Sequence, residues 1–259
     1  MKNNTALIAL SNEGAAISFH LSQKLHDCET YLHDDIKTDL ECKRFSRVLD
    51  LVSEIFGLYE GLIFIGACGV AVRSIAPHIS QQPKDPAVVV VDVCARWVIS
   101  LLSGHEGRAN SLAVEVSNLL GAEPVITTTT QAAKTVIVGV GCKRGITAER
   151  VKKAISNSLH DLKLSLDDVR YIATVDDKSP EKGLSTAATE LGIPLRLISS
   201  KEIMNSTIDF LKSDHVMENT SVPGVSEPSA MLAGRRTKLI QKRKNYDGIS
   251  IAISRENCF

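Results

Sequence analysis

Short apolar runs alternate with longer amphipathic stretches along most of the chain. The runs are typical of buried strands and lie at residues 5–10, 62–65, 87–93, 97–102, 124–126, 135–140, 171–175, 195–198 and, around a polar turn, 238–253. In the stretches between them, apolar residues recur three or four positions apart, which predicts helices. Strands that alternate with helices in this way predict an α/β fold whose mainly parallel sheets are covered by helices.

The predicted helices differ in how clearly their ends are marked. Residues 40–56 keep helical spacing of apolar side chains throughout and predict a single helix. Another helix is expected to begin near Gly104. Gly121 and Gly192 each follow the last apolar residue of a helical pattern, where a glycine commonly ends a helix in the left-handed conformation.

Two features divide this alternating pattern. The runs at 87–93 and 97–102 are separated only by a short turn, which predicts an antiparallel hairpin in the first half. Residues 127–134 are polar and lack periodicity, so we place a domain boundary there. A chain of 259 residues has the length of one or two domains. The prediction is two α/β domains, residues 1–130 and 131–259.

Composition removes several functional classes. The formal net charge is +0, with 30 basic and 30 acidic residues, which argues against a general nucleic-acid-binding protein. No apolar run approaches the ~20 residues needed to cross a bilayer, and the N-terminus lacks a signal-peptide pattern. None of the 6 cysteines forms a C-x-x-C pair, which predicts free thiols and no metal site. We therefore expect a cytoplasmic protein that contacts neither nucleic acid nor membrane.

A glycine-rich turn follows the apolar run at 62–65. Gly66 and Gly69 lie between this strand and a short helix that carries Arg73. Backbone N–H groups that converge at such a turn favour an anion, because the N-terminus of a helix is positive. The third glycine of a dinucleotide fingerprint is absent, which disfavours NAD or FAD. A tight turn without a ligand explains the glycines equally well.

His105 is the most direct candidate for catalysis. It is expected in the first turn of a helix, between Gly104 and Gly107, where its backbone would be open to a ligand. The positive end of a helix favours neutral imidazole, the form that a general base requires. Ser103 and Glu106 have the S-x-x-E spacing of a capping box, which explains both residues without catalysis. A structural or merely exposed histidine remains the alternative.

A second glycine-rich turn follows the run at 135–140. Gly141 and Gly145 flank Lys143 and Arg144, so backbone donors and two cations would meet a carboxylate or a phosphate. The G-K-[ST] end of a Walker loop is missing, which disfavours NTP hydrolysis. Six further basic residues form either a solvated face or the rim of a site for a polyanion. They are Arg235, Arg236, Lys238, Lys242, Arg243 and Lys244.

Seven stretches, taken in order, resemble a known family. They lie at residues 64–77, 85–92, 98–107 and 124–128 in the first half, and at 138–145, 192–195 and 223–227 in the second. This succession is similar to the cobalt-precorrin-5A hydrolase family of cobalamin biosynthesis, CbiG, over nearly the whole chain. Many relatives carry a middle module between the two halves. Only residues 129–134 separate the halves here, so the chain resembles a compact form of the family.

The resemblance implies a hydrolase that acts on carbon–carbon bonds. Its substrate would be cobalt-precorrin-5A, a cobalt-containing tetrapyrrole with many carboxylates. Water would open the δ-lactone of this substrate, and acetaldehyde would leave to give cobalt-precorrin-5B. No protein-bound cofactor is implied, because the cobalt belongs to the substrate. The expected partners are pathway methyltransferases, through transfer contacts.

Two other functions remain open. The second half also resembles a stand-alone accessory protein of the oxygen-dependent cobalamin route, which would make the chain a tetrapyrrole carrier without chemistry. A nucleotide-binding enzyme is disfavoured by the missing motifs.

For the hydrolase, we expect His105 as general base, with Glu106 beside it as a helix cap or as the alternative base. The residues expected to bind substrate are Gly66, Gly69, Arg73, Ser103, Gly104, Gly141, Lys143, Arg144 and Gly145. The three loops that carry them each follow a strand, so we expect them to line one cleft between the domains.

Overall fold

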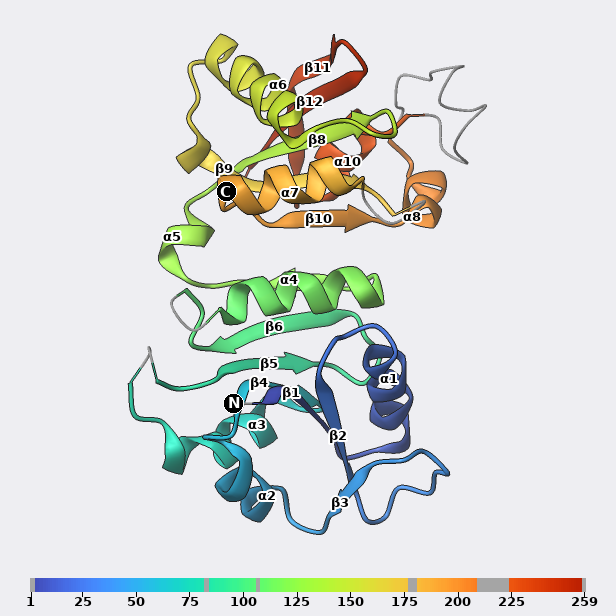
Figure 1. Ribbon diagram of the computed structural model, residues 1–259, viewed down its shortest axis with the longest axis vertical. Helices are drawn as coiled ribbons and strands as arrows, with labels where there is room; N and C mark the ends of the chain where they lie inside the picture. The colour runs from blue at the N-terminus through green and yellow to red at the C-terminus, as the bar shows by residue number, and fades with distance from the viewer. Residues whose placement is uncertain (1–2, 82–83, 106–107, 177–180, 209–223, 258–259) are drawn as a thin grey trace. The chain divides into compact units, whose positions relative to one another are not determined.

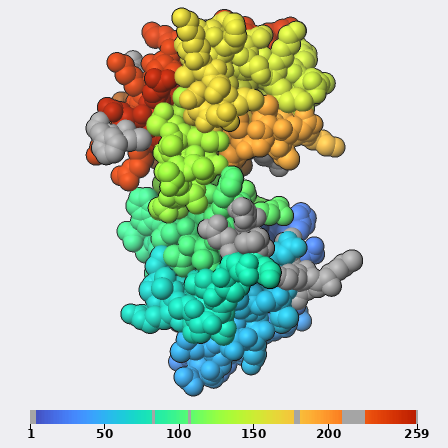
Figure 2. Space-filling view, turned by 90° about the vertical axis from the view of Figure 1, so that its left-hand side faces the viewer, coloured from blue at the N-terminus to red at the C-terminus, as the bar shows by residue number. Residues whose placement is uncertain are grey.

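The computed structural model describes residues 3–81, 84–105, 108–176, 181–208 and 224–257 (Figure 1). It divides into two compact units, Met1–Thr128 and Thr129–Phe259, and each unit has a sheet of its own. Each unit is a continuous stretch of chain, so in Figure 2 the surface of the first runs from blue to green and that of the second from yellow-green to red. Both units combine strands and helices, which confirms the predicted α/β class.

The first unit is a seven-stranded sheet of order β3-β2-β1-β4-β5-β6-β7. Its strands are β1 (Asn3–Ala9), β2 (Cys28–His33), β3 (Lys43–Phe45), β4 (Tyr59–Ile65), β5 (Ala87–Val91), β6 (Trp97–Leu102) and β7 (Glu123–Val125). Its helices are α1 (Asn12–Ser22), α2 (Val48–Ile55), α3 (Cys68–Ile75), the 3-10 turn η1 (Ala76–His78) and α4 (Ala109–Leu120). Neighbouring strands are parallel except β5 and β6, which form the predicted antiparallel hairpin.

Alternate residues of the central strands enter two separate cores, because successive side chains of a strand point to opposite faces. Leu7 and Ile63 pack with α1 and α4 on one face. Ile8 and Phe64 pack with α2 and α3 on the other. Strands buried on both faces read as continuous apolar runs, and this explains why the hydrophobic pattern located them.

The single helix predicted over residues 40–56 is wrong in its first half. Residues Lys43–Phe45 form β3, which pairs in parallel with β2 through Tyr31 and Lys43. The helix α2 begins only at Val48. Sheet pairing therefore overrode the helical spacing, which in this part rested on Phe45.

The second unit is a five-stranded sheet of order β10-β9-β8-β12-β11. Its strands are β8 (Val136–Cys142), β9 (Val169–Val175), β10 (Leu195–Ile198), β11 (Thr237–Tyr246) and β12 (Ile249–Glu256). Its helices are α5 (Thr129–Ala132), α6 (Ala148–Asp161), the 3-10 turn η2 (Leu166–Asp168), α7 (Lys182–Leu191), α8 (Ser200–Asn205) and α10 (Ser226–Leu232). The strands β8, β9 and β10 are parallel, whereas β12 is antiparallel to both β8 and β11.

The helix α10 lies unusually close to the strand β8. A Cβ atom added at Gly139 would lie 1.9 Å from the carbonyl oxygen of Ser226 and 2.7 Å from the amide nitrogen of Ala230. The hydroxyl of Ser254 in β12 donates to the carbonyl oxygen of Ala230 at 2.5 Å. Only glycine at position 139 allows this approach, so α10 covers one face of the sheet while α6 and α7 pack into the core on the other.

Candidate functional site

The Gly66 turn lies at the carboxyl end of β4, next to the end of β1. The chain passes from β1 to β2 and β3 on one side and then returns to β4 on the other side of β1. The ends of β1 and β4 therefore form the switch point where α/β folds bind ligands. The Gly66 amide already donates to the carbonyl oxygen of Val91 at 2.9 Å. The Arg73 guanidinium donates to the carbonyl oxygen of Gly69 at 3.2 Å and is exposed. The turn thus offers one exposed cation beside the start of α3.

His105 lies before α4 and not in its first turn. The helix begins at Ala109, with Arg108 as its N-cap, so Ser103 cannot cap it and the predicted capping box is wrong. The His105 side chain is exposed, whereas Ser103 is only 3% exposed. Glu106 lies outside the described residues. His105 remains a candidate base because its side chain is exposed. The predicted effect of a helix N-terminus on its imidazole is lost, because the helix begins four residues later.

The first backbone amides of α4 donate hydrogen bonds to carbonyl groups of the loop before it. The amide of Ala109 donates to the carbonyl oxygen of Ser103 at 3.1 Å, and that of Asn110 donates to Gly104 at 3.0 Å. Gly104 also has a packing role, because a Cβ atom there would lie 2.6 Å from Cγ2 of Thr128. These contacts tie the backbone of Ser103 and Gly104 to the protein itself, whereas the sequence predicted a backbone open to a ligand beside His105.

The Gly66 and Ser103 loops lie at opposite ends of the strands of the first sheet. Ile65 pairs with Val91 at the end of β5, whereas Leu102 pairs with Val88 at its start. Because β6 runs antiparallel to β5, the end of β6 meets the amino-terminal edge of the parallel strands. The five residues of β5 separate these edges by roughly 15 Å. For the Gly66 and Ser103 loops, the prediction of one shared cleft is therefore wrong.

The loop after β8 presents two exposed cations. Lys143 and Arg144 are both exposed, and the Lys143 amide donates to the carbonyl oxygen of Gly248 at 3.0 Å. The amide of Gly145, which has a φ of 74°, donates to Oε2 of Glu181 at 3.2 Å. A carboxylate of the protein already uses this donor, so the cations are the part of the loop that is available to an anionic ligand.

The surroundings of Cys142, at the end of β8, disfavour its thiolate form. Burial raises the pKa of its thiol to about 11, and the nearby Glu181 carboxylate acts in the same direction. The protonated thiol is a much poorer nucleophile than the thiolate.

The cluster of basic residues near the end of the chain lies mainly on β11, an edge strand. Lys244 forms an ion pair with Asp161 at 2.6 Å, and the Arg243 amide donates to the buried carboxylate of Glu227 at 2.8 Å. Charged side chains on an edge strand hinder pairing with other chains. That role explains the basic residues of β11 without a ligand.

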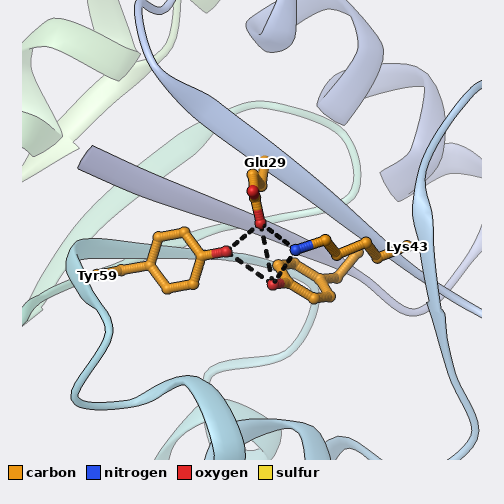
Figure 3. A network of polar contacts seen from close by, with 4 residues as sticks. Glu29, Lys43 and Tyr59 are labelled. Carbon is orange, nitrogen blue, oxygen red and sulfur yellow. Dashed lines mark hydrogen bonds and ion pairs between the residues drawn. The ribbon is translucent and has the colours of Figure 1, made fainter. Parts of the chain in front are cut away.

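A polar network that the sequence did not reveal joins β2, β3 and β4. Glu29 accepts hydrogen bonds from Lys43 at 2.6 Å and from Tyr31 at 3.2 Å, and also from Tyr59 (Figure 3). The Tyr31 and Tyr59 hydroxyls lie 2.7 Å apart. The bonds from Lys43 and Tyr59 lower the pKa of Glu29, so the carboxylate stays ionised. Every polar group in the network has a partner, which indicates a structural role.

Across the described ranges, no group of three or more His, Cys, Asp or Glu side chains is arranged to hold a metal ion. None of the helices in the described part of the chain is both long and apolar enough to cross a membrane.

Three curated proteins illustrate what the chain is similar to. Cobalt-precorrin-5A hydrolase from Priestia megaterium is 25% identical over 357 aligned positions, covering 97% of this chain and 95% of that protein. Cobalt-precorrin-5A hydrolase from Salmonella typhimurium is 54% identical over 77 residues, which is 30% of this chain and 22% of that protein. Protein CobE from a Sinorhizobium species is 27% identical over 117 residues, which is 44% of this chain and 76% of that protein.

The family models match both halves of the chain in order. The model described as cobalamin synthesis G N-terminal matches residues 50–131, and the model described as cobalamin synthesis G C-terminus matches residues 136–254. Only four residues lie between the two matches, while the alignment with the Priestia protein is longer than this chain. Both observations fit a form without a middle module. The chain belongs to the cobalamin synthesis G family.

Proposed function

We propose that this protein is a cobalt-precorrin-5A hydrolase of vitamin B12 biosynthesis. The observation that carries the proposal is the alignment with a relative of that name over 97% of this chain. Both family halves are present in order, one in each unit. The proposal therefore assigns the activity to the chain as a whole.

The reaction consumes one water and releases one acetaldehyde. Water adds to the lactone carbonyl and breaks the bond between the acyl carbon and the ring oxygen, which leaves a carboxylate and a hydroxyl. The carbon that bears this hydroxyl then leaves as acetaldehyde. The electron pair of the broken carbon–carbon bond stays on the macrocycle, which takes up a proton. No oxidant is needed.

His105 is the base that we assign to the first step. Its side chain is exposed and follows the buried Ser103 by two residues. The first amides of α4 hold the carbonyl groups of Ser103 and Gly104, directly before it. A neutral imidazole can accept a proton from water at pH 7. Glu106, next to it in the chain, is the alternative base.

The cations of the two units are assigned to the carboxylates of the substrate. Lys143 and Arg144 are exposed on the loop after β8, and Arg73 is exposed on the helix α3. Charge-assisted hydrogen bonds to carboxylates are among the stronger polar contacts. We assign Arg73 to carboxylates at the periphery of the substrate, far from the lactone, because the Gly66 turn and His105 lie at opposite ends of the strands of the first sheet. No resident cofactor is proposed, since cobalt enters with the substrate.

A carrier without chemistry is the second candidate. The similarity to Protein CobE covers 76% of that protein but only 44% of this chain. It therefore supports a carrier role for only about half of the chain. A carrier would bind the tetrapyrrole and hand it to a pathway methyltransferase in the cytoplasm. It would release no acetaldehyde.

Anaerobic incubation with cobalt-precorrin-5A separates the two candidates. Trapped acetaldehyde is measured against protein concentration, and the same reaction is run in water labelled with oxygen-18. The hydrolase predicts acetaldehyde in proportion to substrate consumed, with one label in the new carboxylate. Binding of substrate without acetaldehyde would favour the carrier and overturn the proposal.

A further inference from the structure

Asn110 forms a buried polar centre at the end of β6. The residue is 6% exposed. Its Oδ1 accepts a hydrogen bond from the Ser100 hydroxyl at 2.8 Å, and its Nδ2 donates to Oγ1 of Thr128 at 3.0 Å. One amide side chain thus joins a strand, the first turn of α4 and the segment that follows β7.

The same residue also holds the segment that carries His105. The backbone amide of Asn110 donates to the carbonyl oxygen of Gly104, and a Cβ atom at Gly104 would lie 3.0 Å from Oδ1 of Asn110. Gly104 therefore sits against the Asn110 and Thr128 side chains, immediately before His105. Asn110 therefore contacts the residue directly before His105 through both its backbone and its side chain.

The backbone of this segment adopts an unfavourable conformation at both ends. Ser103 has a φ of 60° and Arg108 a φ of 68°, a left-handed region that residues other than glycine rarely enter. Such conformations cost of order 1–3 kcal/mol each and persist only where the surroundings impose them. The hydroxyl of Ser103 is buried without a hydrogen-bond partner among the described residues. The backbone amide of Asn110 holds Gly104, the residue next to Ser103, and the amide of Ala109 holds Ser103 itself.

We propose that Asn110 is a positioning residue for His105. The proposal rests on the hydrolase function given above. Asn110 does not need to touch the substrate: its two side-chain hydrogen bonds and its backbone amide fix Gly104, and Gly104 fixes the start of the His105 segment. Both a donor and an acceptor are needed at this position, and an amide supplies them without a buried charge.

Substitutions of Asn110 and of its partner Thr128 test this role. N110A should lower kcat about 100-fold, the effect of a misplacement near 1 Å at a reacting group, while KM changes less than about twofold. T128V removes the acceptor and should lower kcat about tenfold, whereas T128S keeps a hydroxyl and should restore it. T5V replaces another buried threonine of the same unit and is the matched control.

Amide hydrogen exchange tests the positioning role without catalysis. N110A and T128V should speed exchange at Ala109 and at residue 110, which donate to Ser103 and Gly104, at least tenfold. Exchange at Ile63 in the centre of β4 should not change. If the wild-type protein releases no acetaldehyde, the hydrolase function fails while this exchange result still decides the positioning role. Unchanged exchange, or an unchanged kcat in an active T128V, would overturn the inference.

Discussion

The Tyr59 hydroxyl in β4 donates a hydrogen bond to the Glu29 carboxylate in β2, across the intervening strand β1, although 30 residues separate them in the chain. Tyr59 is 1% exposed, so its hydroxyl would be costly to bury without this acceptor. Burial raises the pKa of Tyr59, and the bond to Glu29 raises it further. The tyrosine therefore stays a neutral donor, and the network in Figure 3 ties β2, β3 and β4 together.

E29Q should lower the stability of the first unit in a pH-dependent way. Lys43 and Tyr59 lower the pKa of Glu29 in the folded state, so its stabilisation is present above the ordinary pKa of 4.5 and is lost as the pH falls through the lowered value. The carboxylate is 37% exposed, so water screens it and we expect about 1 kcal/mol at pH 7.

The single tryptophan makes this loss measurable. Trp97 lies in β6, so its fluorescence during urea unfolding reports on the first unit. The difference between wild type and E29Q should be largest at pH 7 and should shrink below pH 4.5. E60Q, which alters an exposed glutamate of β4, should behave as wild type throughout. A difference between E29Q and wild type that grew as the pH fell would contradict the assignment.

G139A should destabilise the second unit by more than about 3 kcal/mol. A methyl group at this position meets the backbone of α10 at 1.9 Å, and overpacking against backbone cannot be relieved by a rotamer change. Circular dichroism should show an earlier unfolding step, while the Trp97 transition stays in place. G57A adds a methyl group where no atom lies within 4 Å and is the control. A wild-type unfolding profile for G139A would mean that α10 does not pack on β8 as described.

Replacing Lys143 and Arg144 together by alanine should weaken substrate binding. Each charge-assisted contact to a substrate carboxylate is worth roughly 1.5–3 kcal/mol when well formed. The thermal midpoint should not change, because both side chains are exposed. The double variant of Lys238 and Lys242, also exposed, removes the same charge from β11 and tests the polyanion rim. If only that pair lowers affinity, the substrate contacts lie on β11.

Burial decided which elements could be predicted from the sequence. The apolar runs of β4, β5 and β8 are buried on both faces, so their pattern was unambiguous. Gly121 and Gly192 end α4 and α7 in the left-handed conformation, as predicted. The strand β2 was missed because its first three residues are half-buried and its pattern shows no clear apolar run.

The geometry of the site could be predicted less well, because it depends on strand direction. That Ser103 follows a strand was correct, but β6 runs opposite to β4, so His105 and Gly66 lie at different edges of the sheet. The role of Asn110 was hidden within a helical pattern, since its partners Ser100 and Thr128 come from other elements. Contacts of that kind leave no periodicity in the sequence.

The rate of acetaldehyde release by H105N tests the assigned chemistry most directly. Single-turnover reactions with cobalt-precorrin-5A under anaerobic conditions compare wild type, H105N, E106Q and H26N, the last altering another exposed histidine of the first unit. Loss of a general base predicts a rate 10²–10⁴ lower for H105N, with substrate binding retained. H26N should match wild type, and E106Q should keep most of the activity. Wild-type release by H105N, or its abolition in E106Q alone, would contradict His105 as the base.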